Sequence, residues 1–188
     1  MRIKYNAPTV LSYALICASV LIIAQTLLPN LMFWFIVPGR GSFQFSSLKS
    51  WVTLFTHVIG HGNWPHLISN FTLILIIGPM LEEIYGSLDL LIMIIITALV
   101  TGLLNVIIFQ SALLGASGVV FMMILLSSFT NFSRGEIPLT FILVLILYIG
   151  TEILSSLGAE QTNISHFAHI IGGLCGSFFG FLRPEKRK

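Results

Sequence analysis

Long apolar stretches alternate with short polar segments along almost the whole chain. Each stretch is close to the roughly 20 residues that an α-helix needs to cross about 30 Å of hydrocarbon. The pattern therefore predicts an all-α, polytopic membrane protein with six transmembrane helices. The predicted spans are residues 9–29, 65–81, 88–109, 113–130, 138–156 and 165–182.

Two of the connecting segments differ from the other, shorter ones. Residues 30–64 combine the aromatic anchors Trp34 and Trp51 with turn formers and polar groups, which predicts a structured first loop lying in the outer leaflet. Residues 155–164 are polar and contain serine and glycine, so we expect a flexible connection there. The remaining connections leave little room for a soluble domain, and we expect residues 1–188 to form a single membrane domain.

Composition supports the same class of protein. Hydrophobic residues make up 56% of the 188 residues and charged residues only 9%, far outside the range of soluble domains. We expect the lipid bilayer as the surroundings of the chain and no nucleic-acid partner.

The distribution of lysine and arginine predicts the orientation, because positive residues in short loops stay in the cytoplasm. If the N-terminus is cytoplasmic, Arg40 and Lys49 lie outside. The other basic residues then lie inside: Arg2, Lys4, Arg134, Arg183, Lys186, Arg187 and Lys188. Both termini are therefore predicted to be cytoplasmic. With no organelle-targeting segment, a bacterial cytoplasmic (inner) membrane is the simplest location.

Alternate spans run in the same direction, so the second, fourth and sixth begin at one membrane level. His66 and Asn70 lie near the start of the second, Ser117 near the start of the fourth and His169 near the start of the sixth. Taken singly, Ser117 in its Gly-Ala-Ser-Gly segment fits helix packing, and His66 with Asn70 fits a hydrogen-bonded pair. Ionisable groups within spans usually line a cavity or pathway. We therefore expect these side chains to meet in one site toward the outer face.

These residue types suit acyl transfer. A serine hydroxyl becomes a nucleophile when a base accepts its proton, and a neutral imidazole can do this and later protonate the leaving amine. We assign these roles to Ser117 and His169. His66, Asn70 and the backbone N–H of Ser117 are the candidate donors to the oxyanion. The predicted second, fourth and sixth spans carry no carboxylate at this level, and Glu152 is the nearest acidic candidate, so we predict a dyad.

Three motifs in this order resemble those of the rhomboid intramembrane serine proteases. They are His66-Leu67-Ile68-Ser69-Asn70, Gly115-Ala116-Ser117-Gly118 and Ala168-His169-Ile170-Ile171-Gly172. The resemblance extends from about Trp51 to Leu182 and implies the bacterial six-helix, rhomboid-like bundle with a structured first loop. It also implies cleavage of other proteins' transmembrane segments without metal or cofactor, and a place for Glu82 at the cytoplasmic turn after the second span.

The resemblance also implies supporting residues around the dyad. Phe121, four residues after Ser117, stands where some members carry a tyrosine ring stacked on the imidazole. The remaining supporting residues are glycines that allow the helices to approach and histidines that support the first loop: Gly115, Gly118, Gly172, His57 and His61.

Two alternatives compete with a protease. His57, His61 and His66 could bind zinc or copper, as in a multi-pass metal-ion transporter, although no carboxylates repeat across the spans to form a path. An inactive rhomboid-like binder of transmembrane segments would be expected to lack Ser117 or His169, and both are present. The sequence does not identify the substrate, the cleavage site, the pathway, any gating motion or the oligomeric state.

Overall fold

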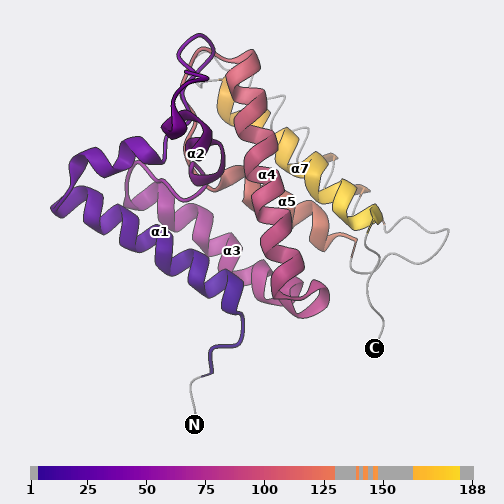
Figure 1. The fold of residues 1–188 in the computed structure, drawn as a ribbon. Coiled ribbons are helices and arrows are strands. Elements are labelled where there is room, and N and C mark those ends of the chain that lie inside the picture. Colours follow the sequence, from indigo (N-terminus) through magenta and orange to yellow (C-terminus); the bar gives the residue numbers. More distant parts are fainter. Residues whose placement is uncertain (1–3, 130–138, 140–141, 144–145, 148–162, 183–188) are drawn as a thin grey trace.

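The structure is a computed structural model of the chain, and it describes residues 4–129, 139, 142–143, 146–147 and 163–182. Within these residues the regular elements are helices, joined by one short β-bridge (Figure 1). They are α1 (Pro8–Thr26), the 3₁₀ helix η1 (Pro29–Trp34), α2 (Leu48–Thr56), α3 (Trp64–Tyr85), α4 (Ser87–Ile108), α5 (Ser117–Ser127) and α7 (Asn163–Leu182). The predicted all-α class is confirmed.

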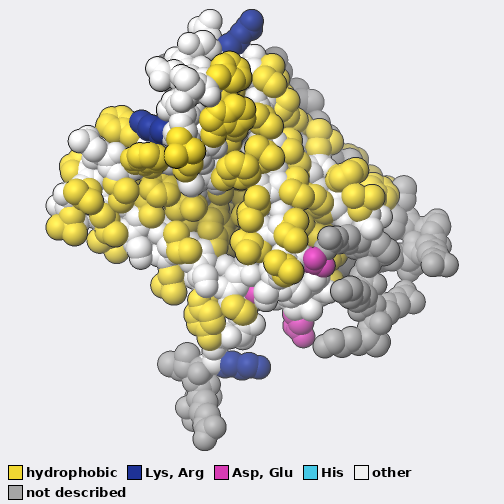
Figure 2. Space-filling model, in the orientation of Figure 1, with side chains coloured by type: hydrophobic (Ala, Val, Ile, Leu, Met, Phe, Trp, Pro, Cys, Tyr) yellow, Lys and Arg dark blue, Asp and Glu magenta, His cyan; other side chains and the backbone are white. Residues whose placement is uncertain are grey.

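Three of the described helices, α1, α3 and α4, are long and apolar enough to cross a membrane. They correspond to the predicted spans 9–29, 65–81 and 88–109. Apolar side chains cover much of the face shown in Figure 2, over α1 and α4, which is the surface expected of helices that face lipid. The predicted fifth span, 138–156, and the segment 155–164 lie largely or wholly outside the described residues.

The predicted fourth span is wrong in its bounds. We expected a helix over 113–130, whereas α5 begins at Ser117 and ends at Ser127. Leu113 is instead extended and pairs with Val37, the two residues exchanging N–H···O bonds of 2.9 and 3.0 Å. At about 16 Å, α5 is too short to cross the hydrocarbon layer, and its N-terminus lies inside the protein.

The first loop is structured, as its mixture of aromatic and turn-forming residues predicts. It contains η1 and α2, and the rings of Phe43, Phe45 and Trp51 pack edge to face in a small cluster. The Trp51 indole N–H also donates to the Phe45 carbonyl at 3.0 Å. The Val37–Leu113 bridge joins the loop to the segment that precedes α5.

Glu82, near the end of α3, caps the start of α1. Its two carboxylate oxygens accept the backbone N–H groups of Thr9 at 2.8 Å and Val10 at 3.0 Å. These N–H groups have no acceptor within their own helix, and a negative charge is favourable there. The Thr9 hydroxyl also donates to the Ser87 carbonyl at 2.9 Å. The starts of α1 and α4 therefore lie at the same end of the molecule, and Glu82 lies at the turn where the sequence places it.

The α5 and α7 helices run parallel, with backbone against backbone. A Cβ built on Gly172 would lie 2.0 Å from the Gly118 carbonyl oxygen, and one on Gly176 would lie 2.1 Å from that of Met122. The two contacts follow each other in the same order along both helices, which shows that the helices are parallel. Only glycine at these positions allows so close an approach, and it sets the distance between the elements that carry Ser117 and His169.

Candidate active site

Ser117 is the first residue of α5 and is half-buried. The first N–H groups of a helix have no intrahelical acceptor and carry the positive end of the helix dipole. Gly115, two residues earlier, has φ +118°, a conformation that side-chain-bearing residues rarely adopt. The glycine turn thus places a hydroxyl and unpaired N–H donors together at a helix start inside the protein.

His169 lies on α7 beside the same part of α5. Its imidazole packs against the Phe121 ring with centroids 4.3 Å apart and planes inclined by 31°. Phe121 lies one turn after Ser117, so the two residues share a face of α5. A Cβ on Gly118 would also lie 3.4 Å from the carbonyl oxygen of Ala168, next to His169. The contact with Phe121 therefore places the imidazole beside the face of α5 that carries Ser117.

His66 and Asn70 project from the first two turns of α3. The side chain of Asn63 caps this helix by accepting the His66 N–H at 2.8 Å. The His66 ring lies against Gly115, where a Cβ would meet its Nε2 and Cε1 atoms at 2.7 Å. A glycine at position 115 therefore leaves room for the imidazole. The starts of α3 and α5 meet at this point, and α7 reaches the same part of α5 through Ala168 and Gly172.

His61 holds the Asn70 amide. Its Nδ1 lies 3.1 Å from the Ile59 carbonyl oxygen, and its Nε2 lies 3.3 Å from Asn70 Nδ2. A carbonyl can only accept, so Nδ1 carries the proton and Nε2 accepts from the Asn70 amide. The same imidazole packs edge to face on His66, with centroids 5.0 Å apart. His61 therefore contacts both side chains that we expect to stabilise an oxyanion.

His57 ties the first loop to α4 and to the glycine turn. Its Nδ1 lies 3.3 Å from the Thr53 carbonyl oxygen and its Nε2 lies 3.3 Å from the Thr101 hydroxyl. Its own carbonyl accepts the Gly115 N–H at 2.9 Å. From the motifs, His57 and His61 are expected only to support the loop. No sequence pattern indicates that their side chains bond to residues of α4 and α3.

Burial keeps both loop histidines neutral. Desolvation lowers the pKa of His57 to about 4 and that of His61 to about 4, and in each case a hydrogen bond to a backbone carbonyl partly opposes the shift. For His61 the nearby His66 adds a smaller lowering effect. A neutral His61 keeps the tautomer described above, which preserves its contact with Asn70 near pH 7.

Within the described part of the chain, no group of three His, Cys, Asp or Glu side chains is placed to hold a metal ion. His57 uses its ring nitrogens on Thr53 and Thr101, and His61 uses its own on Ile59 and Asn70. Glu152, the carboxylate considered for a third catalytic role, lies outside the described residues.

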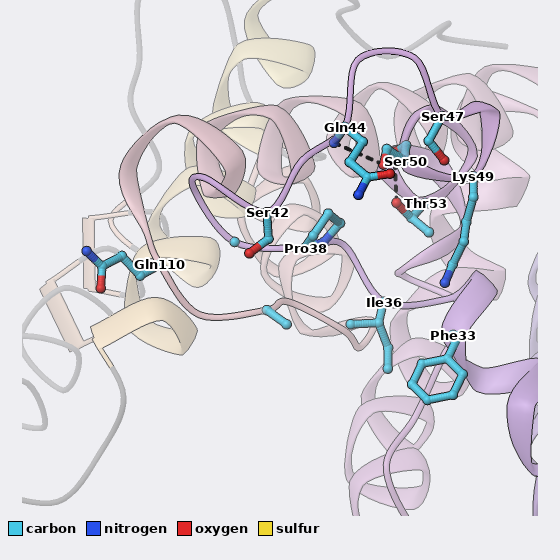
Figure 3. Close-up of a pocket in the computed structure, with 12 residues that line it drawn as sticks. Phe33, Ile36, Pro38, Ser42, Gln44, Ser47, Lys49, Ser50, Thr53 and Gln110 are labelled. Atoms are coloured by element: carbon cyan, nitrogen blue, oxygen red, sulfur yellow. Dashed lines mark hydrogen bonds between the residues drawn. The ribbon is translucent and has the colours of Figure 1, made fainter.

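A polar cavity of about 410 Å³ lies in the first loop (Figure 3). Its lining includes Ser42, Gln44, Lys49 and Thr53, together with Gln110 from the segment after α4. None of the candidate catalytic residues lines it. This cavity therefore belongs to the packing of the loop and is separate from the convergence of α3, α5 and α7.

Comparison with known proteins agrees with the motifs. The family model described as "Rhomboid domain" matches residues 48–186. The chain is 28% identical over 137 residues to "Rhomboid protease GlpG" of Haemophilus influenzae, covering 71% of this chain and 70% of that protein. It is 26% identical over 176 residues to "Rhomboid-like protein 11, chloroplastic" of Arabidopsis thaliana, covering 78% of this chain but only 63% of the plant protein. The range matched by the family model contains every candidate site residue.

Proposed function

We propose that this chain, which belongs to the rhomboid family, is an intramembrane serine endopeptidase that uses Ser117 and His169 as a dyad. Membership confirms the family expected from the three motifs, and rhomboid proteins are in general membrane-embedded serine proteases that act on transmembrane proteins. The proposal goes further, because it assigns the activity and the residues to this chain.

The observation that carries the proposal is the packing of the His169 ring on Phe121, one turn from Ser117, between helices in backbone contact. In the proposed reaction Ser117 Oγ attacks the carbonyl carbon of a substrate peptide bond while His169 accepts the hydroxyl proton. The imidazolium then protonates the leaving amine as the C–N bond breaks. Water attacks the resulting ester by the same route and releases Ser117.

The negative charge that develops on the carbonyl oxygen needs donors that are already in place. We assign this role to the Ser117 N–H at the start of α5 and to the side chains of His66 and Asn70. Preorganised donors of this kind are worth about 3–4 kcal/mol each in a site that excludes water. The neutral His61 supports the assignment, since it accepts one amide hydrogen of Asn70 and fixes the orientation of that side chain.

We further propose that residues 1–188 form one rhomboid membrane domain of six spans, with both termini in the cytoplasm and the site toward the outer face. The positive-inside distribution supports this orientation. A bacterial cytoplasmic membrane is the proposed location, and no cofactor is required by the reaction.

The test is cleavage of a reporter that contains a transmembrane segment, with the full chain reconstituted in liposomes. Ser117→Ala and His169→Ala should each lower the rate by roughly 10⁴-fold or more. Ser128→Ala, which removes a hydroxyl that donates to the Ile124 carbonyl near the end of the same helix, should cleave like the wild type. Chelators should have no effect.

Three results would overturn the proposal. Full cleavage by Ser117→Ala would exclude this serine as the nucleophile. A chain that binds the reporter without cutting it would be an inactive relative, and chelator-sensitive metal uptake that is indifferent to Ser117→Ala would favour the transporter.

A further inference from the structure

A groove of about 440 Å³ lies between α1, α4 and the loop that follows α2. Apolar side chains dominate its lining, with a few hydroxyls at the end where α1 begins. The lining residues used below are Tyr13 and Ile16 of α1, Phe55 of α2, Val58 and Ile59 of the loop, and Leu91 and Ile95 of α4. None of the candidate catalytic residues belongs to it.

The position of the groove determines what can fill it. Two of its walls are helices that are long and apolar enough to cross a membrane, and outside the groove the same helices carry exposed Leu15 and Ile22 on α1 and Ile92 and Ile96 on α4. Hydrocarbon is the surroundings of such a surface. Along α1 the groove runs from Pro8 to Ile16, about 12 Å at 1.5 Å per residue, which is close to the depth of one leaflet of a core about 30 Å thick.

The groove is open along one side to the hydrocarbon that surrounds α1 and α4. Lipid acyl chains are therefore the apolar groups that lie at its mouth. An extended hydrocarbon chain is narrow enough to lie in the groove along its full length.

The end of the groove near Pro8 suits a lipid headgroup. Tyr5 precedes α1 there, and its hydroxyl is hydrogen-bonded to Ser12 of the lining at 3.0 Å. Tyrosine is typical of the membrane interface. A phospholipid of the leaflet at this end of α1 can thus place its headgroup beside Tyr5 and one acyl chain in the groove.

We infer that the groove is a binding site for one acyl chain of a phospholipid from the leaflet in which α1 begins. The acyl chain packs against Val58 and Ile59, which lie between His57 and His61. This segment is joined to α1 by a hydrogen bond of 2.7 Å, which the Tyr13 hydroxyl donates to the Val58 carbonyl. The bound lipid therefore supports the loop whose histidines contact Thr101 and Asn70. This inference does not depend on the proposed protease activity.

The experiment uses the full chain in phosphatidylcholine liposomes that contain a phosphatidylcholine with a diazirine on one acyl chain. After photolysis, cross-linked peptides are identified by mass spectrometry. We expect cross-links at Phe55, Ile59 and Leu91, lining residues with exposed surface, to exceed those at Ile22 and Ile92, which lie outside the lining, by at least severalfold. Equal labelling of the two sets would overturn the inference.

Matched variants test occupancy directly. Ile95→Trp fills the groove from α4, whereas Ile96→Trp adds the same ring at the next position, which is 40% exposed against 43% for Ile95 but lies outside the lining. Ile16→Trp and Ile22→Trp form an equivalent pair on α1, with exposures of 49% and 46%. The groove variants should lose the cross-links at Phe55, Ile59 and Leu91, and the controls should keep them.

Loss of these cross-links in both members of a pair, or in neither, would contradict a specific acyl site. A protein cross-link between two copies that disappears with Ile95→Trp would instead assign the groove to a second chain and overturn the inference. Reporter cleavage is not among these readouts, so an inactive protease would leave the result interpretable.

Discussion

At the scale of single residues, two buried histidines outside the proposed dyad organise the site. His61 accepts from Asn70 and packs on His66, while His57 accepts the Gly115 N–H through its carbonyl. Protonation of His61 would add an N–H at Nε2, where the contact with the Asn70 amide needs an acceptor, and protonation of His57 would place a charge on a fully buried ring. The structure therefore depends on both rings staying neutral.

This dependence predicts a pH effect on stability. An unfolded histidine titrates near pH 6.5, whereas both pKa values are lowered to about 4 in the folded chain. Between these values the unfolded chain binds more protons, so the free energy of unfolding falls as the pH drops from about 6.5 to 4 and levels off below. Each histidine contributes up to about 3 kcal/mol to this loss.

The measurement is thermal unfolding in detergent, followed by tryptophan fluorescence between pH 4 and 8. His57→Gln and His61→Gln should each flatten the slope in that window relative to the wild type. Lys49→Gln, which replaces a side chain whose ammonium lies over the Phe33 ring, should leave it unchanged. An unaltered slope in the double histidine variant would show that these rings titrate normally.

Sequence patterns located the polar residues but not their partners. The motifs place Ser117, His169, His66 and Asn70 at the starts of alternate helices, and the structure brings the three helix starts together. The bond from Asn70 to His61 joins residues nine apart across the bend into α3. No periodicity reveals such a bond, because it depends on how the loop folds back.

At the scale of elements, the start of α5 could not be placed from hydropathy. Leu113 and Leu114 continue the apolar stretch, so the pattern extends the span to residue 113. The chain instead pairs Leu113 with Val37 and turns at Gly115 before helix begins at Ser117. The only local signal was Gly115 itself, since the long-range bridge is invisible in sequence. This error matters, because it places Ser117 at a helix N-terminus rather than one turn inside.

The contact between α5 and α7 yields a prediction in which two effects have opposite signs. Gly172→Ala should stabilise an isolated helix by about 1 kcal/mol. In the folded chain the new Cβ would meet the Gly118 carbonyl oxygen at 2.0 Å, and backbone cannot yield as a flexible side chain does. We expect overpacking to prevail and to lower stability by roughly 1–3 kcal/mol net, with loss of activity as His169 moves away from Ser117.

Melting temperature and reporter cleavage measure the two effects. Gly62→Ala is the control, since a Cβ there meets nothing within 4 Å, and it should change neither quantity appreciably. A Gly172→Ala protein as stable and active as the wild type would mean that the two helices are not in backbone contact.

At the scale of the whole molecule, the long spans and the family could be predicted with little more than hydropathy and three motifs. Helices α1, α3 and α4 follow the predicted spans because about 20 apolar residues suffice to define a transmembrane helix. The groove between α1 and α4 could not be predicted, since it arises from how the loop after α2 lies against two separate helices. The capping of α1 by Glu82 likewise joins positions more than 70 residues apart.

The central claim is that Ser117 is a nucleophile activated by His169, and covalent labelling by a fluorophosphonate tests it most directly. The reagent loses fluoride as a serine oxygen bonds to phosphorus, and peptide mapping identifies the modified residue. We predict a single adduct on Ser117 in the liposome-embedded wild type, unchanged in Ser128→Ala and absent in His169→Ala. Labelling of Ser117 at an undiminished rate in His169→Ala, or no adduct on correctly folded wild type, would contradict the account.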